Sequence, residues 1–356
     1  MAEAGINQLL NISWTLHRLS PLHHEKEYQT LLDNPVALKT YAARLRDQLT
    51  GNVLAGVQTG APAVAEESLF RTGALKDCTW ETISTLALLE PEDVSGSHSS
   101  SQSAGISVTL EYENITYRAV LLAPPNPSHT LSARKKSTYL PLLLTRFPSP
   151  LRQNFISFLS DNFDTYCSSL RLPSQFMCSA LEMYLNALKL GDEGRDAQIV
   201  LEDIVKELQL TVAFSPHVAP ALRSLNINVP QSSLKSVMLM SSGPSGTPGH
   251  GSVLSGLSAY VEKHLAMDLD LAGSSSSSNV TKQHVRVSKI ACGGFLLAGE
   301  GRLKLVVQLG KPGSGDRSTD NDEEARNQRS RLALRANEAL LHLVLRRAAS
   351  SELDDI

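Results

Sequence analysis

Residues 285–309 read VRVSKIACGGFLLAGEGRLKLVVQL, and this stretch decides the fold. In its second half, apolar residues take every other position at 303, 305, 307 and 309. This period of two is typical of a strand with one buried face. The first half, 285–291, alternates less regularly, and the glycines at 293, 294, 299 and 301 indicate positive φ in turns. The stretch predicts a β-hairpin.

The sequence around this hairpin predicts that it lies at the edge of a sheet. A Ser-rich tract, 273–278, precedes it and a Gly/Asp-rich tract, 310–324, follows it. A strand between two such tracts is poorly placed to be a protected central strand. Edge strands present unpaired N–H and C=O groups that can recruit a strand of another chain. The candidate partner-binding residues are Val285, Val287, Lys289, Leu303, Leu305 and Val307.

The composition is that of a folded protein without a strong overall charge. The chain has 356 residues, of which 42% are hydrophobic, so it can bury a sizeable core. Its formal net charge of -3 gives no bulk attraction to DNA or to an anionic membrane. Any contact with DNA therefore needs a local cationic patch.

One compact cationic cluster lies away from a helix end, at Arg134, Lys135 and Lys136. It follows a Pro-rich stretch. It is either a solubilising loop or a DNA-facing patch that contacts phosphates, whose binding would weaken steeply with salt. No interleaved aromatic residues indicate base stacking.

The N-terminal residues lack a basic start followed by an apolar run, and no apolar run reaches about 18 residues. The sequence thus predicts a soluble intracellular protein without a membrane span. The four cysteines are widely spaced and have no zinc-like spacing, which favours buried free thiols.

Strand and helix patterns alternate along the rest of the chain. Asn34 is a good N-cap for a helix that we expect to end at Gly51, with a short strand at 53–59. Alternation over 106–122 predicts a tight hairpin. Further strands are expected at 11–22, 139–146, 211–214 and 225–229, and helices at 151–166, 173–190, 197–210, 253–267 and 322–347. The expected fold is α+β, with largely antiparallel twisted sheets, packed helices, a C-terminal hairpin and a C-terminal helix.

These patterns suggest three parts. Residues 1–147 form an N-terminal α/β part with a Ser-rich loop at 95–105, and residues 148–210 form a helical segment. Residues 211–356 form a C-terminal α/β part with the hairpin and with flexible loops at 241–252, 272–281 and 310–324.

The sequence contains no motif that argues for catalysis, a cofactor or a metal. Neither GxxxxGK[ST] nor GxGxxG is present, so no phosphate-binding loop is expected. Residues 243–247 match a nucleophile elbow except at the last position, and they lie in a Pro/Gly/Ser tract. Two alternatives stay open: a hydrolase or transferase on an α/β scaffold with Ser245 or a histidine in its site, and a free-standing DNA-binding protein.

Several sequence blocks resemble the centromere protein L (CENP-L) family, particularly its fungal kinetochore members. The similar blocks occur in the same order over nearly the whole chain: SWTLHRLSPLH (13–23), YAARLRDQL (41–49), VLAGV (53–57), CTW (78–80), SVTLEY (107–112), YLPLLL (139–144), RLPS (171–174), LSAY (257–260), VRVSKIACGGF (285–295) and RLKLV (302–306). The Ser-rich tracts at 95–105 and 273–278 depart from the family pattern and look like insertions.

The resemblance implies a non-enzymatic subunit of the constitutive inner kinetochore, in the nucleus at the centromere. Members of this family pair with CENP-N through a sheet shared by the two chains, and some also form homodimers. The pair helps to link the CENP-A nucleosome and centromeric DNA to CENP-C and other inner-kinetochore subunits. No short family motif transfers DNA-contacting residues to this sequence.

Overall fold

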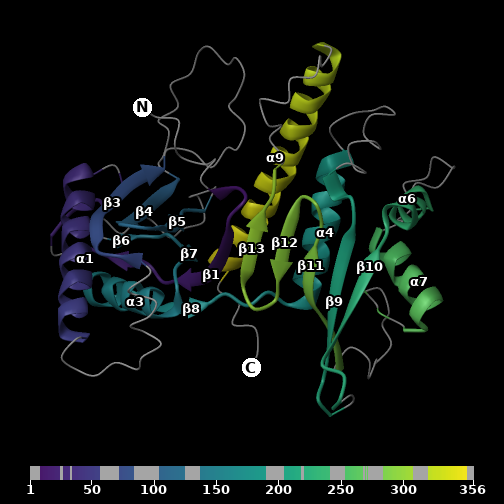
Figure 1. Cartoon of the computed structure of the whole chain (residues 1–356), viewed down its shortest axis with the longest axis horizontal. Coiled ribbons are helices and arrows are strands. Elements are labelled where there is room, and N and C mark those ends of the chain that lie inside the picture. Colours follow the sequence, from purple (N-terminus) through teal and green to yellow (C-terminus); the bar gives the residue numbers. More distant parts are fainter. Residues whose placement is uncertain are drawn as a thin grey trace. The chain divides into compact units, whose positions relative to one another are not determined.

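The computed structural model describes residues 9–24, 27–32, 34–56, 72–83, 104–124, 137–189, 204–217, 220–240, 253–267, 269, 271, 284–307 and 320–350 (Figure 1). The chain forms two compact units. Unit 1 contains Met1–Gln8, Trp14–Leu170 and Val344–Ile356, and unit 2 contains Leu9–Ser13 and Arg171–Leu343. The fold is α+β with antiparallel sheets and a long C-terminal helix, as predicted.

In unit 1, antiparallel strands lie in the order β8-β1-β7-β5-β4-β3. Their bounds are β1 Ser13–Leu19, β3 Leu75–Ile83, β4 Gly105–Tyr112, β5 Thr116–Leu122, β7 Leu142–Arg146 and β8 Cys167–Ser169. A separate pair joins β2 (Leu22–His23) to β6 (Ser137–Thr138). The tight hairpin predicted over 106–122 is confirmed as β4 and β5, with Leu110 opposite Tyr117.

Two helices cover one face of this sheet, α1 (Pro35–Gly56) and α3 (Ser149–Phe163). Asn34 Oδ1 accepts the N–H of Ala37 at 3.1 Å, which confirms the predicted N-cap. The helix continues past Gly51 to Gly56, so the expected helix end is wrong, as is a strand over 53–56. A Cβ at Gly51 would meet nothing within 4 Å, and a solvent-facing glycine inside a helix costs only about 1 kcal/mol.

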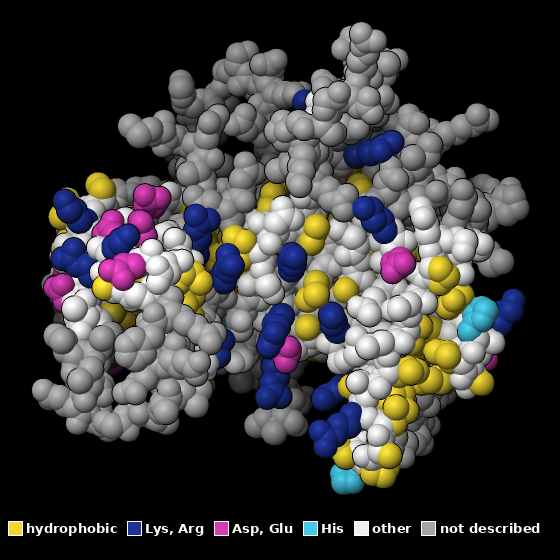
Figure 2. Space-filling model, in the orientation of Figure 1, with side chains coloured by type: hydrophobic (Ala, Val, Ile, Leu, Met, Phe, Trp, Pro, Cys, Tyr) yellow, Lys and Arg dark blue, Asp and Glu magenta, His cyan; other side chains and the backbone are white. Residues whose placement is uncertain are grey.

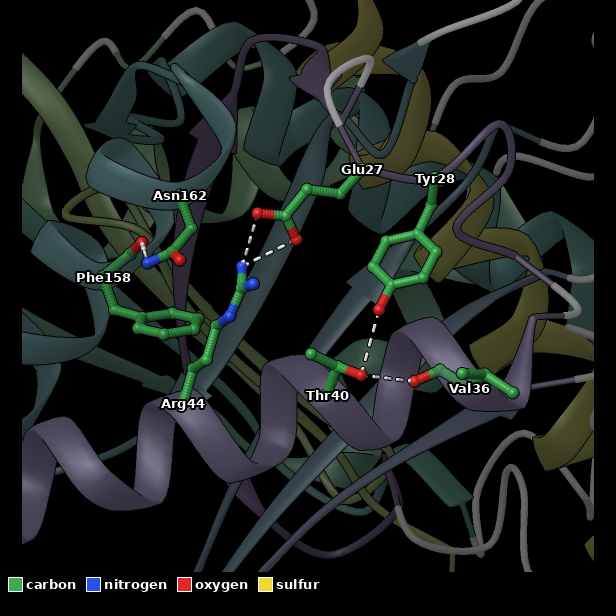
Figure 3. Close-up of polar contacts among 7 residues, drawn as sticks. All are labelled: Glu27, Tyr28, Val36, Thr40, Arg44, Phe158 and Asn162. Atoms are coloured by element: carbon green, nitrogen blue, oxygen red, sulfur yellow. Dashed lines mark hydrogen bonds and ion pairs between the residues drawn. The ribbon is translucent and has the colours of Figure 1, made fainter.

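The segment before α1 is held to that helix by polar contacts (Figure 3). Arg44 Nη1 lies 2.8 Å from Glu27 Oε2, and the Tyr28 hydroxyl donates to Thr40 Oγ1 at 3.0 Å. Thr40 in turn donates to the carbonyl of Val36 at 2.9 Å. Because the ion pair is solvent-exposed, it contributes little stability, and we assign the cluster a positioning role.

The other face of the unit 1 sheet meets the end of α9 (Asp320–Ala349). The Arg18 guanidinium, on β1, donates to the carbonyl of Ser350, and the Tyr139 hydroxyl donates to the carbonyl of Ala349 at 3.2 Å. These contacts satisfy carbonyls that a helix C-terminus leaves without intrahelical partners.

In unit 2 the antiparallel order is β10-β9-β11-β12-β13. The bounds are β9 Leu208–Phe214, β10 Ser224–Val229, β11 Val285–Ala291, β12 Phe295–Ala298 and β13 Arg302–Leu305. Residues 285–305 therefore form a three-stranded meander of β11, β12 and β13, and the prediction of two strands is wrong. The strands expected at 211–214 and 225–229 are confirmed.

Helices α4 (Ser174–Lys189), α6 (Gln231–Met240), α7 (Val253–Leu265) and the first part of α9 complete unit 2. The Tyr184 ring of α4 lies 4.7 Å from that of Phe295, and Asn337 of α9 donates to the carbonyl of Val306 at 3.1 Å. These contacts place α4 and α9 on the apolar side of the strands. The sequence did not predict α6, and residues 208–210, expected in a helix, begin β9.

The glycines of the meander act differently from the prediction. Of the four, Gly301 has positive φ, at 83°. A Cβ at Gly293 would lie 2.2 Å from the carbonyl oxygen of Ile204, and one at Gly294 would lie 2.0 Å from the Tyr184 hydroxyl. Gly293 and Gly294 are thus required for close packing and not for a left-handed turn.

Several expected segments lie outside the described residues. These are most of the helix predicted at 197–210, the tract 241–252, the loop 272–281, and most of the loops 95–105 and 310–324.

Candidate functional site

Strand β11 is paired on both sides, so the prediction that it is an edge strand is wrong. Lys289 lies opposite Thr211 of β9 and also opposite Ala298 of β12. Val285 and Val287 pair with Phe214 and Val212 of β9. The backbone of β11 is therefore taken up by neighbouring strands and offers no open edge to a partner chain.

The outer side of β13 is covered within unit 2 by the chain's own N-terminal segment. The N–H of Asn11 donates to the carbonyl of Leu305 at 2.7 Å. The Asn11 side chain donates to the carbonyl of Val307 at 3.2 Å and accepts its N–H at 3.3 Å. Leu303 is paired with Leu297, and the side chains of Leu303, Leu305 and Val307 are all buried. These residues belong to the core. The prediction that β13 offers an open edge is therefore also wrong.

The end strand of unit 1, β3, carries features that discourage pairing with another chain. A β-bulge lies between Leu75 and Asp77, and the Asp77 carboxylate accepts the N–H of Cys78 at 2.8 Å. Lys76 and Glu81 are exposed beside it. Bulges and charges are devices by which proteins protect sheet edges.

The end strand of unit 2, β10, pairs with β9 without a bulge, and its own side chains are uncharged, with the exposed Arg223 directly before it. The N–H of Phe214 donates to the carbonyl of Arg223, so alternate residues from 223 onward bond to β9. Ser224, Asn226 and Asn228 consequently direct their N–H and C=O groups away from β9. None of these backbone groups has a hydrogen-bond partner in the part of the chain that the structure describes. Their side chains are exposed, polar and uncharged.

Unit 2 also presents a cationic sheet face. The strands β9 to β13 contain four cations, Arg286, Lys289, Arg302 and Lys304, and no Asp or Glu. The register puts all four on one face, because Lys289 lies opposite Ala298 and Ala298 lies opposite Arg302. The opposite face carries buried Ile290, Leu297 and Leu303. Figure 2 shows Lys and Arg side chains gathered over β11 to β13, where acidic side chains are sparse.

A β-bulge creates this cationic face. The pairing of β11 with β9 shifts register between Val287 and Lys289, so Arg286 and Lys289 point to the same side. Gln209, Thr211, Asn226 and Asn228 share that side, since Thr211 lies opposite both Lys289 and Asn226. Glu300 forms an exposed ion pair with Arg302 at 2.9 Å, which partly offsets one cation. The sequence clue was the irregular alternation of VRVSKIA together with strands that lack carboxylates.

The other residues that the sequence suggested as sites lie outside the described residues. These are the cationic cluster Arg134, Lys135 and Lys136, and Ser245. A depression of about 400 Å³ on α4 is lined by Ser179, Glu182, Met183, Asn186 and Ala187. Within the described ranges no group of three or more His, Cys, Asp or Glu side chains could hold a metal ion. None of the helices there is long and apolar enough to cross a membrane.

The four cysteines are free, with Cys78 and Cys178 buried. Burial raises the pKa of the Cys78 and Cys167 thiols to about 12 and that of Cys178 to about 11. Such thiols stay protonated near neutral pH, and a protonated thiol is a poor nucleophile.

An α+β chain with an open strand edge and a cationic sheet face has the features of a protein that acts through interaction surfaces. The model of the family described as Centromere protein L (CENP-L) matches residues 8–349, nearly the whole chain. The chain belongs to the CENP-L family, and is thus a centromere and kinetochore protein of the nucleus. This is a structural kinetochore family and not a known enzyme family. A search of curated proteins finds no match.

Proposed function

We propose that this chain is a structural subunit of the inner kinetochore that binds a CENP-N-like protein by strand addition at β10. The observation that carries the proposal is the open backbone of Ser224, Asn226 and Asn228. A strand of the partner that pairs with β10 would meet the outward N–H donors and C=O acceptors of these three residues in alternation. The contrast with β3, whose edge is bulged and charged, favours β10 as the docking edge.

The test is the variant Asn226→Pro. Because the N–H of Asn226 points away from β9, proline removes an outward donor without breaking the β9–β10 ladder. We expect affinity for the CENP-N-like partner to fall at least tenfold, or about 1.4 kcal/mol, in a titration of the purified chains. Asn226→Thr keeps the N–H and is the matched control. A folded Asn226→Pro variant with the partner affinity of the parent chain would refute strand addition at β10.

A second surface supports the role of the family at chromatin. We infer that the cationic face of unit 2 contacts DNA phosphates when the chain links centromeric chromatin to the kinetochore. Arg286, Lys289 and Lys304 are at least partly accessible and have no carboxylate on their own or neighbouring strands. Four cations on one sheet face form the local patch that the overall charge of -3 does not supply. CENP-C and the CENP-A nucleosome remain proposed partners of the complex.

Charge reversal tests this surface. We expect Lys289→Glu with Lys304→Glu to weaken binding of duplex DNA by the partner complex, measured by fluorescence anisotropy. Each lost phosphate contact should reduce the slope of log affinity against log salt by about 0.9. Lys39→Glu with Lys76→Glu makes the same charge change at two exposed positions of unit 1. Equal DNA binding by both double variants would remove the cationic face from the interface.

A further inference from the structure

Three residues of the chain's own N-terminal segment, Leu9, Leu10 and Asn11, close the outer edge of β13. Leu10 forms an isolated parallel bridge with Leu305, and the N–H of Asn11 donates to the carbonyl of Leu305 at 2.7 Å. The side chains of Leu9 and Leu10 are buried, so this pairing is anchored in the core. All of these residues belong to unit 2. We call Leu9, Leu10 and Asn11 the clasp.

At Asn11 the extended backbone of the clasp ends, and the side chain continues the pairing. The φ of Asn11 is 59°, in the left-handed region, which asparagine tolerates better than most residues. The Asn11 carboxamide donates to the carbonyl of Val307 at 3.2 Å and accepts the N–H of Val307 at 3.3 Å. A carboxamide offers an N–H donor and a C=O acceptor, as a peptide unit does. The side chain of Asn11 therefore takes the place that the next residue of a strand would have.

The backbone groups of Val307 that Asn11 binds are those that a further strand would need. The N–H of Val306 donates to the carbonyl of Gly294 at 2.8 Å, on the side of β12. Because successive residues of a strand direct their backbone groups to opposite sides, Leu305 and Val307 direct theirs away from β12. The clasp thus occupies the outward carbonyl of Leu305 and both outward groups of Val307.

We propose that the clasp is an edge guard, which keeps β13 from pairing with β10 of a second copy of this chain. The two strands lie at opposite ends of the order β10-β9-β11-β12-β13, and β10 has open outward groups at Ser224, Asn226 and Asn228. If β13 were open as well, β10 of one copy could add to β13 of the next. Such a head-to-tail contact repeats without closing and produces open chains of copies. The guard confines strand addition in unit 2 to β10.

The test removes the carboxamide with Asn11→Gly. Glycine adopts positive φ freely and keeps the N–H that binds Leu305. We expect the Val307 amide of the full chain to exchange its hydrogen about tenfold faster, because it loses its hydrogen-bond acceptor. We also expect the mass measured by light scattering to rise with concentration beyond that of the parent chain. Asn34→Gly is the matched control, since it removes an asparagine acceptor from a backbone N–H of α1 in unit 1.

The double variant Asn11→Gly with Asn226→Pro identifies the edge that the second copy uses. Proline at position 226 removes an outward donor of β10, so the mass of the double variant should not exceed that of the parent chain. Self-association that persists in the double variant would overturn the pairing of β13 with β10. A folded Asn11→Gly chain with the Val307 exchange rate or the mass of the parent chain would overturn the guard.

A second variant covers the case in which Asn11→Gly melts early. Asn11→Asp also tolerates positive φ, but its carboxylate cannot donate to the carbonyl of Val307. We expect its mass to rise with concentration, and a mass equal to that of the parent chain would overturn the guard. No CENP-N-like protein takes part in these measurements, so their outcome is independent of the proposed function.

Discussion

Gly294→Ala is expected to destabilise unit 2 by about 3 kcal/mol or more, a value at the upper end for an overpacked core. The added Cβ would lie 2.0 Å from the hydroxyl oxygen of Tyr184 and 2.8 Å from its Cζ. Tyr184 is fully buried in α4 and its ring packs against that of Phe295 at an interplanar angle of 58°, so it cannot swing away without losing that contact. Thermal and urea unfolding of the parent chain and of the Gly294→Ala variant would measure the loss of unfolding free energy. Gly51→Ala, where a Cβ meets nothing, should be neutral or slightly stabilising.

The same contact provides a rescue experiment. The Tyr184 hydroxyl is buried and has no hydrogen-bond partner among the described residues. Tyr184→Phe alone should therefore be neutral or stabilising, because it removes an unsatisfied polar group. In the Gly294→Ala background it should recover part of the lost stability, since the shortest clash is with the hydroxyl. If the changes in unfolding free energy of Gly294→Ala and Tyr184→Phe simply added in the double variant, the two positions would not interact and the expected clash would be refuted.

Acid is expected to destabilise unit 1 through His17. The side chain is 5% exposed, and its Nε2 has no partner among the described residues. Burial, with a contribution from the Arg152 charge, lowers the pKa of His17 from 6.5 to about 4. The unfolded chain binds this proton below pH 6.5, whereas the folded chain does so only near pH 4. Stability should therefore fall as the pH drops from 6.5 to 4.

The expected size of this effect is up to about 3 kcal/mol, because each unit of pKa difference corresponds to about 1.4 kcal/mol. His17→Leu removes the titrating group and fills the same apolar surroundings. Melting temperatures of the parent chain and of the His17→Leu variant are measured between pH 4 and 8. The part of their difference that changes with pH is the contribution of His17. Parallel pH profiles would mean that His17 is protonated equally well in the folded and unfolded chains.

The two end strands, β3 and β10, differ in how their open edges are protected. At β3, the Asp77 carboxylate occupies the outward N–H of Cys78 and a bulge interrupts regular pairing. At β10, the outward groups are regular and the side chains within the strand are uncharged. An open edge of this kind is an aggregation hazard unless a partner covers it. The architecture of unit 2 is therefore consistent with a subunit that works in a complex.

Local sequence patterns were enough to determine many individual elements. The alternation over 106–122 specified a hairpin, and Asn34 with Pro35 specified the start of α1. The 3.6-residue period of the last helix specified α9, which begins near its acidic residues and ends after Arg346 and Arg347. These signals lie within a few residues of each other, so no knowledge of distant contacts is needed to interpret them. The ordered sequence blocks also carried the family resemblance.

Tertiary structure alone decided which strands are edges and which cations share a face. Strand β11 finds its partner β9 more than 70 positions earlier in the sequence, as in the pair Val285 and Phe214, so its flanking tracts said nothing about its neighbours. Gly294 is needed because Tyr184 of a distant helix approaches it. The cationic face likewise depends on a bulge and on the register of β11, β12 and β13. Strand pairing is set by nonlocal burial and hydrogen bonding, and hydrophobic periodicity shows which face of a strand is buried but not which strand lies beside it.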